Sequence, residues 1–333
     1  MSELDEAVIG MANQLNIDVK DITVVPHESG VWGNTLYELS TSHHHFLHKC
    51  FNSFETVNIA YNPPNIPVHR RLEISVNMQN MALEKVQCSN ISIPRIRLVL
   101  SKSFVMDYIE EGSNIKKMLD NGHNITGFRE LGKALAQLHN SCDSFQILND
   151  INEMYLYKLS IQYSPSSIEG LSKKEKNLYK ELHAELLNSQ TDFVLIHGDF
   201  NGKNVVVKDS GEMCIIDFEH SGCGKRVYDL AYFVADIMIS AVASVEKELC
   251  FCDIYDFLSS YIRDTNKCEE ELRSLWNHVG VQLLYRLTGP PSLSWTGFFS
   301  NEKISKIDCI GRRMLGESFD LNSLNRSLEF FWN

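Results

Sequence analysis

The chain has 333 residues, 44% of them hydrophobic, and a formal net charge of −12. Its length allows two lobes with substantial cores. The negative charge argues against nucleic-acid binding, which needs a basic face to neutralise phosphates. No apolar stretch is long enough, without a charge, to predict a membrane span.

The acidity fits a cationic small substrate, but it equally fits a protein that is acidic for solubility alone. Residues 1–10 lack the basic and apolar regions of a signal peptide. The nine cysteines are scattered without a C-x-x-C pair, as expected for reduced thiols in the cytoplasm.

The first hundred residues predict a small α+β unit. Apolar spacing predicts a helix over residues 4–15, and a strand follows over residues 22–26. Gly30 and Gly33 lie in a short loop between two β-rich segments. Such a loop lets backbone N–H groups approach phosphates, although two glycines between strands more often make an ordinary hairpin.

A strand over residues 46–51 carries one lysine, Lys49, and strand alternation places it on the same face as Leu47 and Phe51. This pattern favours an inward-pointing side chain over a solvated one. A helical stretch over residues 70–86 follows, and two strands are expected within residues 96–106.

From residue 113 onward the pattern is mainly helical. The segment 230–245 is the most apolar, but Asp236 interrupts it, so it is interpreted as a buried helix. The predicted helices cover residues 125–141, 151–163, 173–188, 230–245, 252–265, 269–287 and 302–315.

Residues 195–217, LIHGDFNGKNVVVKDSGEMCIID, are the most informative part of the sequence. Asp199 precedes Asn204 by five residues, and a turn and an apolar strand then lead to Asp217. The β-branched flanks predict a hairpin that brings Asn204 and Asp217 to the same end. This spacing is typical of phosphoryl transfer, in which one carboxylate accepts the hydroxyl proton and two other groups hold Mg²⁺.

The segment resembles the catalytic and metal-binding loops of protein kinases. Gly198 replaces their arginine, and Glu219 replaces the glycine of Asp-Phe-Gly. These variants, with Tyr228-Asp229-Leu230-Ala231 further on, resemble the aminoglycoside phosphotransferase and choline kinase family of small-molecule kinases. The resemblance implies a two-lobed, kinase-like α+β fold, with a five-stranded antiparallel N-lobe and a mainly helical C-lobe that contains the catalytic hairpin.

The resemblance also implies a division into a nucleotide-binding lobe at residues 1–108 and a catalytic and substrate-binding lobe at residues 109–333. ATP or GTP would bind with Mg²⁺ between the lobes. Asp199 would be the base, His197 would support the loop, and Asn204 and Asp217 would be the metal ligands.

The nucleotide would lie under the loop of Gly30, Gly33 and Asn34, with its phosphates against Lys49. A helix glutamate normally pairs with this lysine. Glu73 is the preferred candidate, with Glu84 and Gln79 as alternatives. Backbone groups of Met106 and Tyr108, in the expected hinge, would bind the adenine edge.

The expected acceptor is a hydroxyl group of a small, amine-bearing molecule, such as an aminoglycoside-like or other antibiotic or an amino alcohol. Glu219 and Asp199 are the expected acceptor contacts. Acids such as Asp253 and Asp256, with Trp276, Tyr285 and Trp295, are weaker candidates for binding an ammonium group and are better explained by core and surface roles.

Two alternatives remain open. One is a metabolic kinase for choline, ethanolamine, homoserine or methylthioribose, and the other is a nucleotide-binding pseudokinase that acts as an interaction protein. A protein kinase is less favoured, because no Ala-Pro-Glu segment follows Asp217. The protein is expected to be a monomer or homodimer without nucleic-acid or membrane partners.

Overall fold

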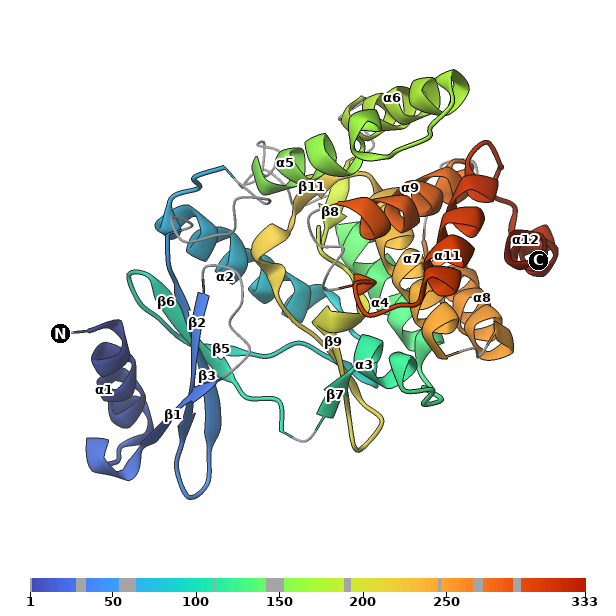
Figure 1. Ribbon diagram of the computed structural model, residues 1–333. Helices are drawn as coiled ribbons and strands as arrows, with labels where there is room; N and C mark the ends of the chain where they lie inside the picture. Colours follow the sequence, from blue (N-terminus) through green and yellow to red (C-terminus); the bar gives the residue numbers. More distant parts are fainter. Residues whose placement is uncertain are drawn as a thin grey trace.

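The computed structural model describes residues 2–27, 34–53, 64–110, 112–141, 153–188, 193–244, 247–265, 272–289 and 295–333. A five-stranded antiparallel sheet and a larger helical part lie side by side (Figure 1). The predicted α+β architecture, with an antiparallel N-lobe and a mainly helical C-lobe, is confirmed.

The N-lobe sheet has the strand order β1-β2-β3-β6-β5. Helices α1 and α2 lie on opposite faces of this sheet (Figure 1). Their apolar side chains pack against the two faces. These elements are α1 (Glu3–Leu15), β1 (Thr23–His27), β2 (Asn34–Ser40), β3 (His45–Phe51), α2 (Val68–Lys85), β5 (Ile96–Val99) and β6 (Ser103–Asp107).

A second, four-stranded sheet carries the predicted hairpin, β9 (Val205–Lys208) and β10 (Met213–Ile215). The strands β4 (Ile91–Ser92) and β7 (Gly112–Asn114) pair with its two outer edges. Neither flanking strand was predicted, because segments of two or three residues carry no readable alternation. The hairpin itself is confirmed, with Ile215 opposite Val205.

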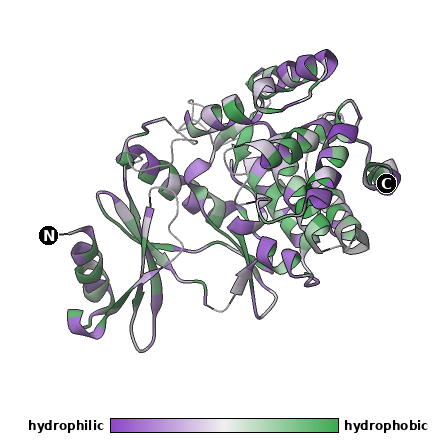
Figure 2. Cartoon of the chain, viewed as in Figure 1, coloured by the Kyte–Doolittle hydropathy of each residue, from purple (hydrophilic) through white to green (hydrophobic). Residues whose placement is uncertain are grey.

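The C-lobe core is built around α7, which packs mainly against α9, α3 and α8. Hydrophobic residues are concentrated in these central helices (Figure 2). The C-lobe elements are α3 (Ile115–Asp120), α4 (Phe128–Asn140), α5 (Glu153–Gln162), α6 (Lys173–Leu187), β8 (Val194–Ile196), β11 (Gly222–Gly224), α7 (Arg226–Ser244), α8 (Lys247–Asp264), α9 (Leu275–Thr288), α11 (Asn301–Met314) and α12 (Leu324–Trp332).

Helix α7 is long and apolar enough to cross a membrane by length and composition alone. However, 89% of its apolar window is buried inside the fold, so it is a core helix, as predicted. The other predicted helices are found within a few residues of their expected ends. The part of the predicted 269–287 helix that is described begins at Leu275, and the C-terminal helix α12 was not predicted.

Candidate active site

The loop between β8 and β9 carries Asp199, and two side chains of the surrounding structure hold this loop through three hydrogen bonds. Both carboxylate oxygens of Asp229, on α7, accept backbone N–H groups of the loop, from His197 at 2.6 Å and from Gly198 at 3.0 Å. Ser221 donates its hydroxyl to the His197 carbonyl at 3.0 Å. Asp229 therefore braces this loop.

His197 is fully buried and links the loop to the hairpin. Its Nε2 atom lies 2.9 Å from the Ile216 carbonyl, and its Nδ1 atom accepts the Asp199 N–H at 3.3 Å. Burial lowers the pKa of His197, which keeps the ring neutral. Its contacts are those of a group that supports the loop geometry.

Asn204 and Asp217 lie at the same end of the hairpin. The Ile216 N–H donates to the Asn204 carbonyl at 3.0 Å, directly after the last paired residues of β9 and β10. Asp217 has a left-handed backbone, with φ +69°, which is rare for a residue with a side chain. Such conformations cost about 1–3 kcal/mol and cluster at functional sites.

Asp199 is held on both carboxylate oxygens. Asn204 donates its amide to Oδ2 at 2.8 Å, and Lys158 of α5 lies 2.5 Å from Oδ1. Burial raises the pKa of Asp199, but Lys158 and His220 outweigh this effect, so the pKa lies well below its usual value. Lys158 was not predicted, because nothing in the α5 sequence indicates a partner 41 residues away.

Lys49 reaches from the N-lobe to the hairpin, as its position on β3 predicted. Its Nζ atom lies 2.5 Å from Asp217 Oδ1 and 3.6 Å from Glu219 Oε2. Burial by itself lowers the pKa of Lys49, but the two carboxylates outweigh it and raise the pKa above the ordinary value.

Glu73 does not pair with Lys49, which corrects the sequence-based preference. Its half-exposed side chain pairs instead with Arg70 at 2.9 Å. Gln79 does not pair with the lysine either, since it donates to the Pro94 carbonyl at 2.7 Å. The physical reason is helix phase: Arg71, Ser75 and Gln79 are buried along one side of α2, and Glu73 is not.

Glu219 takes the position beside Lys49 that was expected for a helix glutamate. It also accepts hydrogen bonds from Arg71 at 3.2 Å and from Asn34 at 3.1 Å. Despite its burial, the charges of Lys49, His220 and Arg71 lower the pKa of Glu219 to about 2. Glu219 therefore faces the N-lobe and is fully engaged there, whereas the sequence suggested an acceptor contact.

Arg71 is a site residue that the sequence analysis missed. Besides Glu219, it donates to the Asn34 side chain at 3.1 Å and to the Asn52 carbonyl at 2.8 Å. Its position in phase with the buried face of α2 was a usable signal, because an arginine on such a face needs an acidic partner.

The structure describes only some of the residues that were predicted to bind the nucleotide. Gly30 and Gly33 lie outside the described residues, whereas Asn34 begins β2. The Tyr108 N–H donates to the His45 carbonyl at 3.2 Å, so it is not free to bind an adenine. Met106 lies in β6, paired with Leu47 of β3.

The weaker acceptor candidates are dispersed. Trp276 is buried in the C-lobe core against Phe319 and Phe331. Asp256, on α8, pairs with Arg129 at 2.9 Å. The neighbouring acids Glu269, Glu270 and Glu271, which the sequence groups with Asp253 and Asp256 as weaker candidates, lie outside the described residues.

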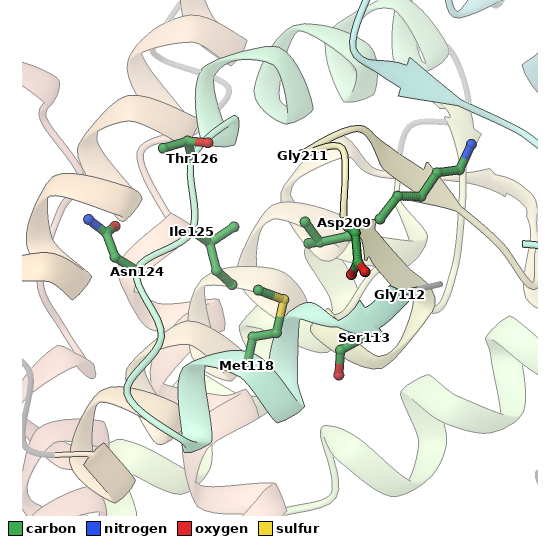
Figure 3. A pocket seen from close by; sticks show the side chains of 10 residues that line it. Gly112, Ser113, Met118, Asn124, Ile125, Thr126, Asp209 and Gly211 are labelled. Atoms are coloured by element: carbon green, nitrogen blue, oxygen red, sulfur yellow. The ribbon is translucent and has the colours of Figure 1, made fainter. Parts of the chain in front are cut away.

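A cavity of about 670 Å³ lies beside the turn of the β9–β10 hairpin. Ser113, Met118, Ile125 and Asp209 are among the residues that line it (Figure 3). Asn204 and Asp217 lie at the opposite end of the hairpin, so this cavity is separate from the candidate active site.

Gly198 lets the loop backbone pass close to the backbone of His220, and a substitution there tests this contact. Its φ is +73°, and a Cβ atom there would lie 2.1 Å from the His220 carbonyl oxygen. We expect Gly198→Ala to lower the free energy of unfolding by roughly 2–4 kcal/mol and to reduce activity. Urea unfolding of each variant measures this effect.

Gly211 provides the matched control for Gly198. It also has a positive φ, +83°, but a Cβ atom there would meet nothing within 4 Å. Gly211→Ala is expected to cost about 1 kcal/mol, through backbone conformation alone. Equal losses in the two variants would contradict the proposed contact with His220.

Asp253 supplies a pH-dependent prediction. Burial and the neighbouring Asp256 raise its pKa to about 7. Because the folded state binds this proton more tightly than the unfolded state, stability falls as the pH rises from about 4 to about 7. We expect Asp253→Asn to be more stable than the parent chain by roughly 2–4 kcal/mol at a pH of about 8.

The same denaturation series at a pH of about 4 is the control for Asp253→Asn. The parent carboxyl is then protonated, and the two proteins should be nearly equal in stability. A difference that stays constant with pH would contradict the shifted pKa.

Residues 93–251 match the model of the phosphotransferase enzyme family (APH). The search of the curated proteins gave no significant match.

Solved structures share the fold at low sequence identity. An amicoumacin kinase in complex with AMP-PNP and Ca²⁺ has 13% identity and a TM-score of 0.57, over 97% of this chain and 100% of that one. The choline kinase of Cryptosporidium parvum Iowa II has 15% identity and a TM-score of 0.52, over 98% and 94%. A spectinomycin phosphotransferase in complex with ADP and spectinomycin has 15% identity and a TM-score of 0.50, over 93% and 88%.

Proposed function

We propose that the chain is a small-molecule kinase of the phosphotransferase enzyme family (APH), whose model matches residues 93–251, and that it transfers the γ-phosphate of ATP to a hydroxyl group of its acceptor. One observation carries the proposal: Lys49 from the N-lobe meets Asp217 at the end of the hairpin, 2.5 Å away. The lysine and the metal-ligand pair of a phosphoryl-transfer site thus come together from separate lobes.

Asn204 and Asp217 would hold Mg²⁺, and their chemistry fits this ion. Mg²⁺ prefers hard oxygen ligands and usually binds one or two carboxylates together with substrate phosphates. Among the described residues, no hydrogen bond uses Asn204 Oδ1 or Asp217 Oδ2. When bound, Mg²⁺ offsets the charge on the phosphates.

Lys49 would bind the phosphates, with Glu219 holding its ammonium group in place. Both carboxylates around Lys49 come from residues 217–219, so one short segment would orient the lysine and bind the metal. Gly30, Gly33 and Asn34 would cover the phosphates, and Met106 would border the adenine. The lobe boundary near residue 108 belongs to the same proposal.

Asp199 would orient the acceptor hydroxyl and accept its proton. Its carboxylate is ionised, a fifth of its side chain is exposed, and its orientation is held by Lys158 and Asn204. A carboxylate oxygen has two lone pairs, so each oxygen can still accept a bond from a hydroxyl. His197 would keep this loop in register with the hairpin.

The amine-bearing acceptor expected from the sequence, an antibiotic or an amino alcohol, is the class to test first. The Asp217-Phe218-Glu219 segment and the acidic net charge support it. A metabolic choline- or ethanolamine-type kinase is the second candidate, supported by the fold shared with a choline kinase. A cytoplasmic monomer or homodimer remains the expected form.

An acceptor screen with coupled detection of ADP tests the proposed function. It should include aminoglycosides, peptide antibiotics, choline, ethanolamine and sugars, each with Mg²⁺ and with either ATP or GTP. We expect at least one hydroxyl compound to raise ADP formation above the rate with water. Nucleotide binding without any acceptor-dependent turnover would favour a pseudokinase instead.

A further inference from the structure

Lys158 places a buried ammonium group directly on the proposed base. Its residue is 5% exposed, and its Nζ atom lies 2.5 Å from Asp199 Oδ1 and 2.8 Å from the Gly198 carbonyl oxygen. The same Nζ atom lies 5.2 Å from the ring centre of Tyr232 on α7. Two hydrogen bonds and an aromatic face thus fix its position.

His220 Nδ1 lies 3.9 Å from the other carboxylate oxygen, Asp199 Oδ2, but the other lysine and arginine side chains near the loop point elsewhere. Lys203 is a loop residue, but its Nζ atom lies 4.3 Å from the ring centre of Trp295. Arg286 lies over the same ring and donates to the Tyr232 carbonyl. Among the lysines and arginines that the structure describes, Lys158 alone comes within 4 Å of the Asp199 carboxylate.

Helix α5 is anchored so that Lys158 has little freedom. Tyr155 packs edge-on against Tyr228 of α7, with ring centres 5.0 Å apart. Gln162, at the end of the same helix, accepts a hydrogen bond from the Tyr228 hydroxyl at 3.0 Å. Both ends of α5 are therefore anchored to Tyr228, and this fixes the backbone from which Lys158 extends.

An ammonium group at this point affects which acceptors can bind. A hydroxyl that approaches Asp199 brings the atom on its neighbouring carbon close to the same carboxylate. If that neighbour were an ammonium group, it would compete with Lys158 for Asp199 and would be repelled by it. A neutral neighbour, such as a second hydroxyl, would meet no such repulsion.

We propose that Lys158 is a positioning and specificity-determining residue, whose ammonium group occupies the place beside Asp199 that an acceptor's own vicinal ammonium group would take. This inference rests on the proposed role of Asp199. It selects acceptors whose phosphorylated hydroxyl has a neutral neighbour, such as sugar or polyol hydroxyls, including those of antibiotics with a remote amine. Vicinal amino alcohols such as ethanolamine and choline are disfavoured, so this inference narrows the acceptors named under the proposed function.

Matched acceptor pairs test the inference. Glucose with glucosamine, and 1,2-propanediol with 1-amino-2-propanol, differ by one hydroxyl-to-amine exchange beside a hydroxyl. We expect the parent enzyme to prefer the neutral member, and Lys158→Ala to shift the ratio of kcat/KM values toward the amine by about tenfold or more. Lys158→Arg should keep the parent preference at a reduced rate.

Lys203→Ala is the matched control, since it removes a cation from the loop itself without changing the one on Asp199. It should leave the ratio unchanged. A parent preference for the amine member, or the same ratio in Lys158→Ala as in the parent, would overturn the inference while leaving the kinase assignment intact. Lys158→Met replaces the alanine variant if thermal unfolding shows that the latter does not fold.

Rescue of Lys158→Ala by added methylammonium distinguishes a direct role of the ammonium group from a purely structural role of the side chain. It should restore turnover of Lys158→Ala in a saturable manner, with the best acceptor or with water, whereas tetramethylammonium, which has no N–H donor, should not. Equal effects of the two salts would contradict the inference. If the parent enzyme forms no ADP with any acceptor or with water, the proposed function itself fails.

Discussion

Replacing Asp199 with asparagine is expected to lower kcat by about 10²- to 10⁴-fold, the range in which a positioned general base contributes. Asparagine keeps the size of the side chain and can still accept a hydrogen bond at one position. It cannot take a proton from an acceptor hydroxyl. It also loses the charge that pairs with Lys158, 2.5 Å away.

The effect of Asp199→Asn should be confined to kcat and should spare nucleotide binding. Asp199 makes no contact with Lys49 or Asp217 among the described residues, so the KM for ATP should change little. Coupled ADP detection and nucleotide binding by calorimetry together check this result. A loss of ATP binding that parallels the loss of kcat would place Asp199 in the nucleotide site instead.

Asp217→Asn is expected to abolish Mg²⁺-dependent tightening of nucleotide binding and to lower kcat by at least about 10²-fold. Two effects combine in this variant. The proposed metal site loses its one charged ligand, and Lys49 loses the carboxylate that lies nearest to its ammonium group. Titration of nucleotide binding against Mg²⁺ measures the first effect directly.

Asp209→Asn is the matched control for Asp217→Asn. Asp209 is an exposed aspartate in the turn of the same hairpin, at the end away from Asn204. The substitution removes the same charge from the same hairpin and should leave kcat and Mg²⁺ dependence unchanged. If Asp217→Asn retained normal Mg²⁺ dependence, the proposed pair of metal ligands would be wrong.

The sequence predicted the parts of the site that are close together along the chain. Asp199, Asn204 and Asp217 lie within one loop and one hairpin, and β-branched flanks determine how the hairpin folds. Lys49 followed from strand alternation, which places every second side chain on one face.

The errors concern side chains whose partners are distant in sequence. Glu73 was chosen for its position early in α2, but the rotation of that helix against the sheet turns Arg71 toward the site instead. Glu219 was expected near the acceptor because it closely follows β10, the strand that leads to Asp217. The turn at residues 218–220 directs it to Lys49 and Arg71.

By itself, the sequence determined the order of the lobes, the β9–β10 hairpin with Asn204 and Asp217 at one end, and the neighbouring loop that carries Asp199. These features depend on short-range periodicity and on the few turns that can join two apolar strands. Only the tertiary structure decided how the charges pair. Lys158 meets Asp199 from another helix, and Glu219 meets Arg71 across the lobes. The reason is that a buried charge takes whichever partner the packing of whole elements brings within reach, and that distance is not encoded in local spacing.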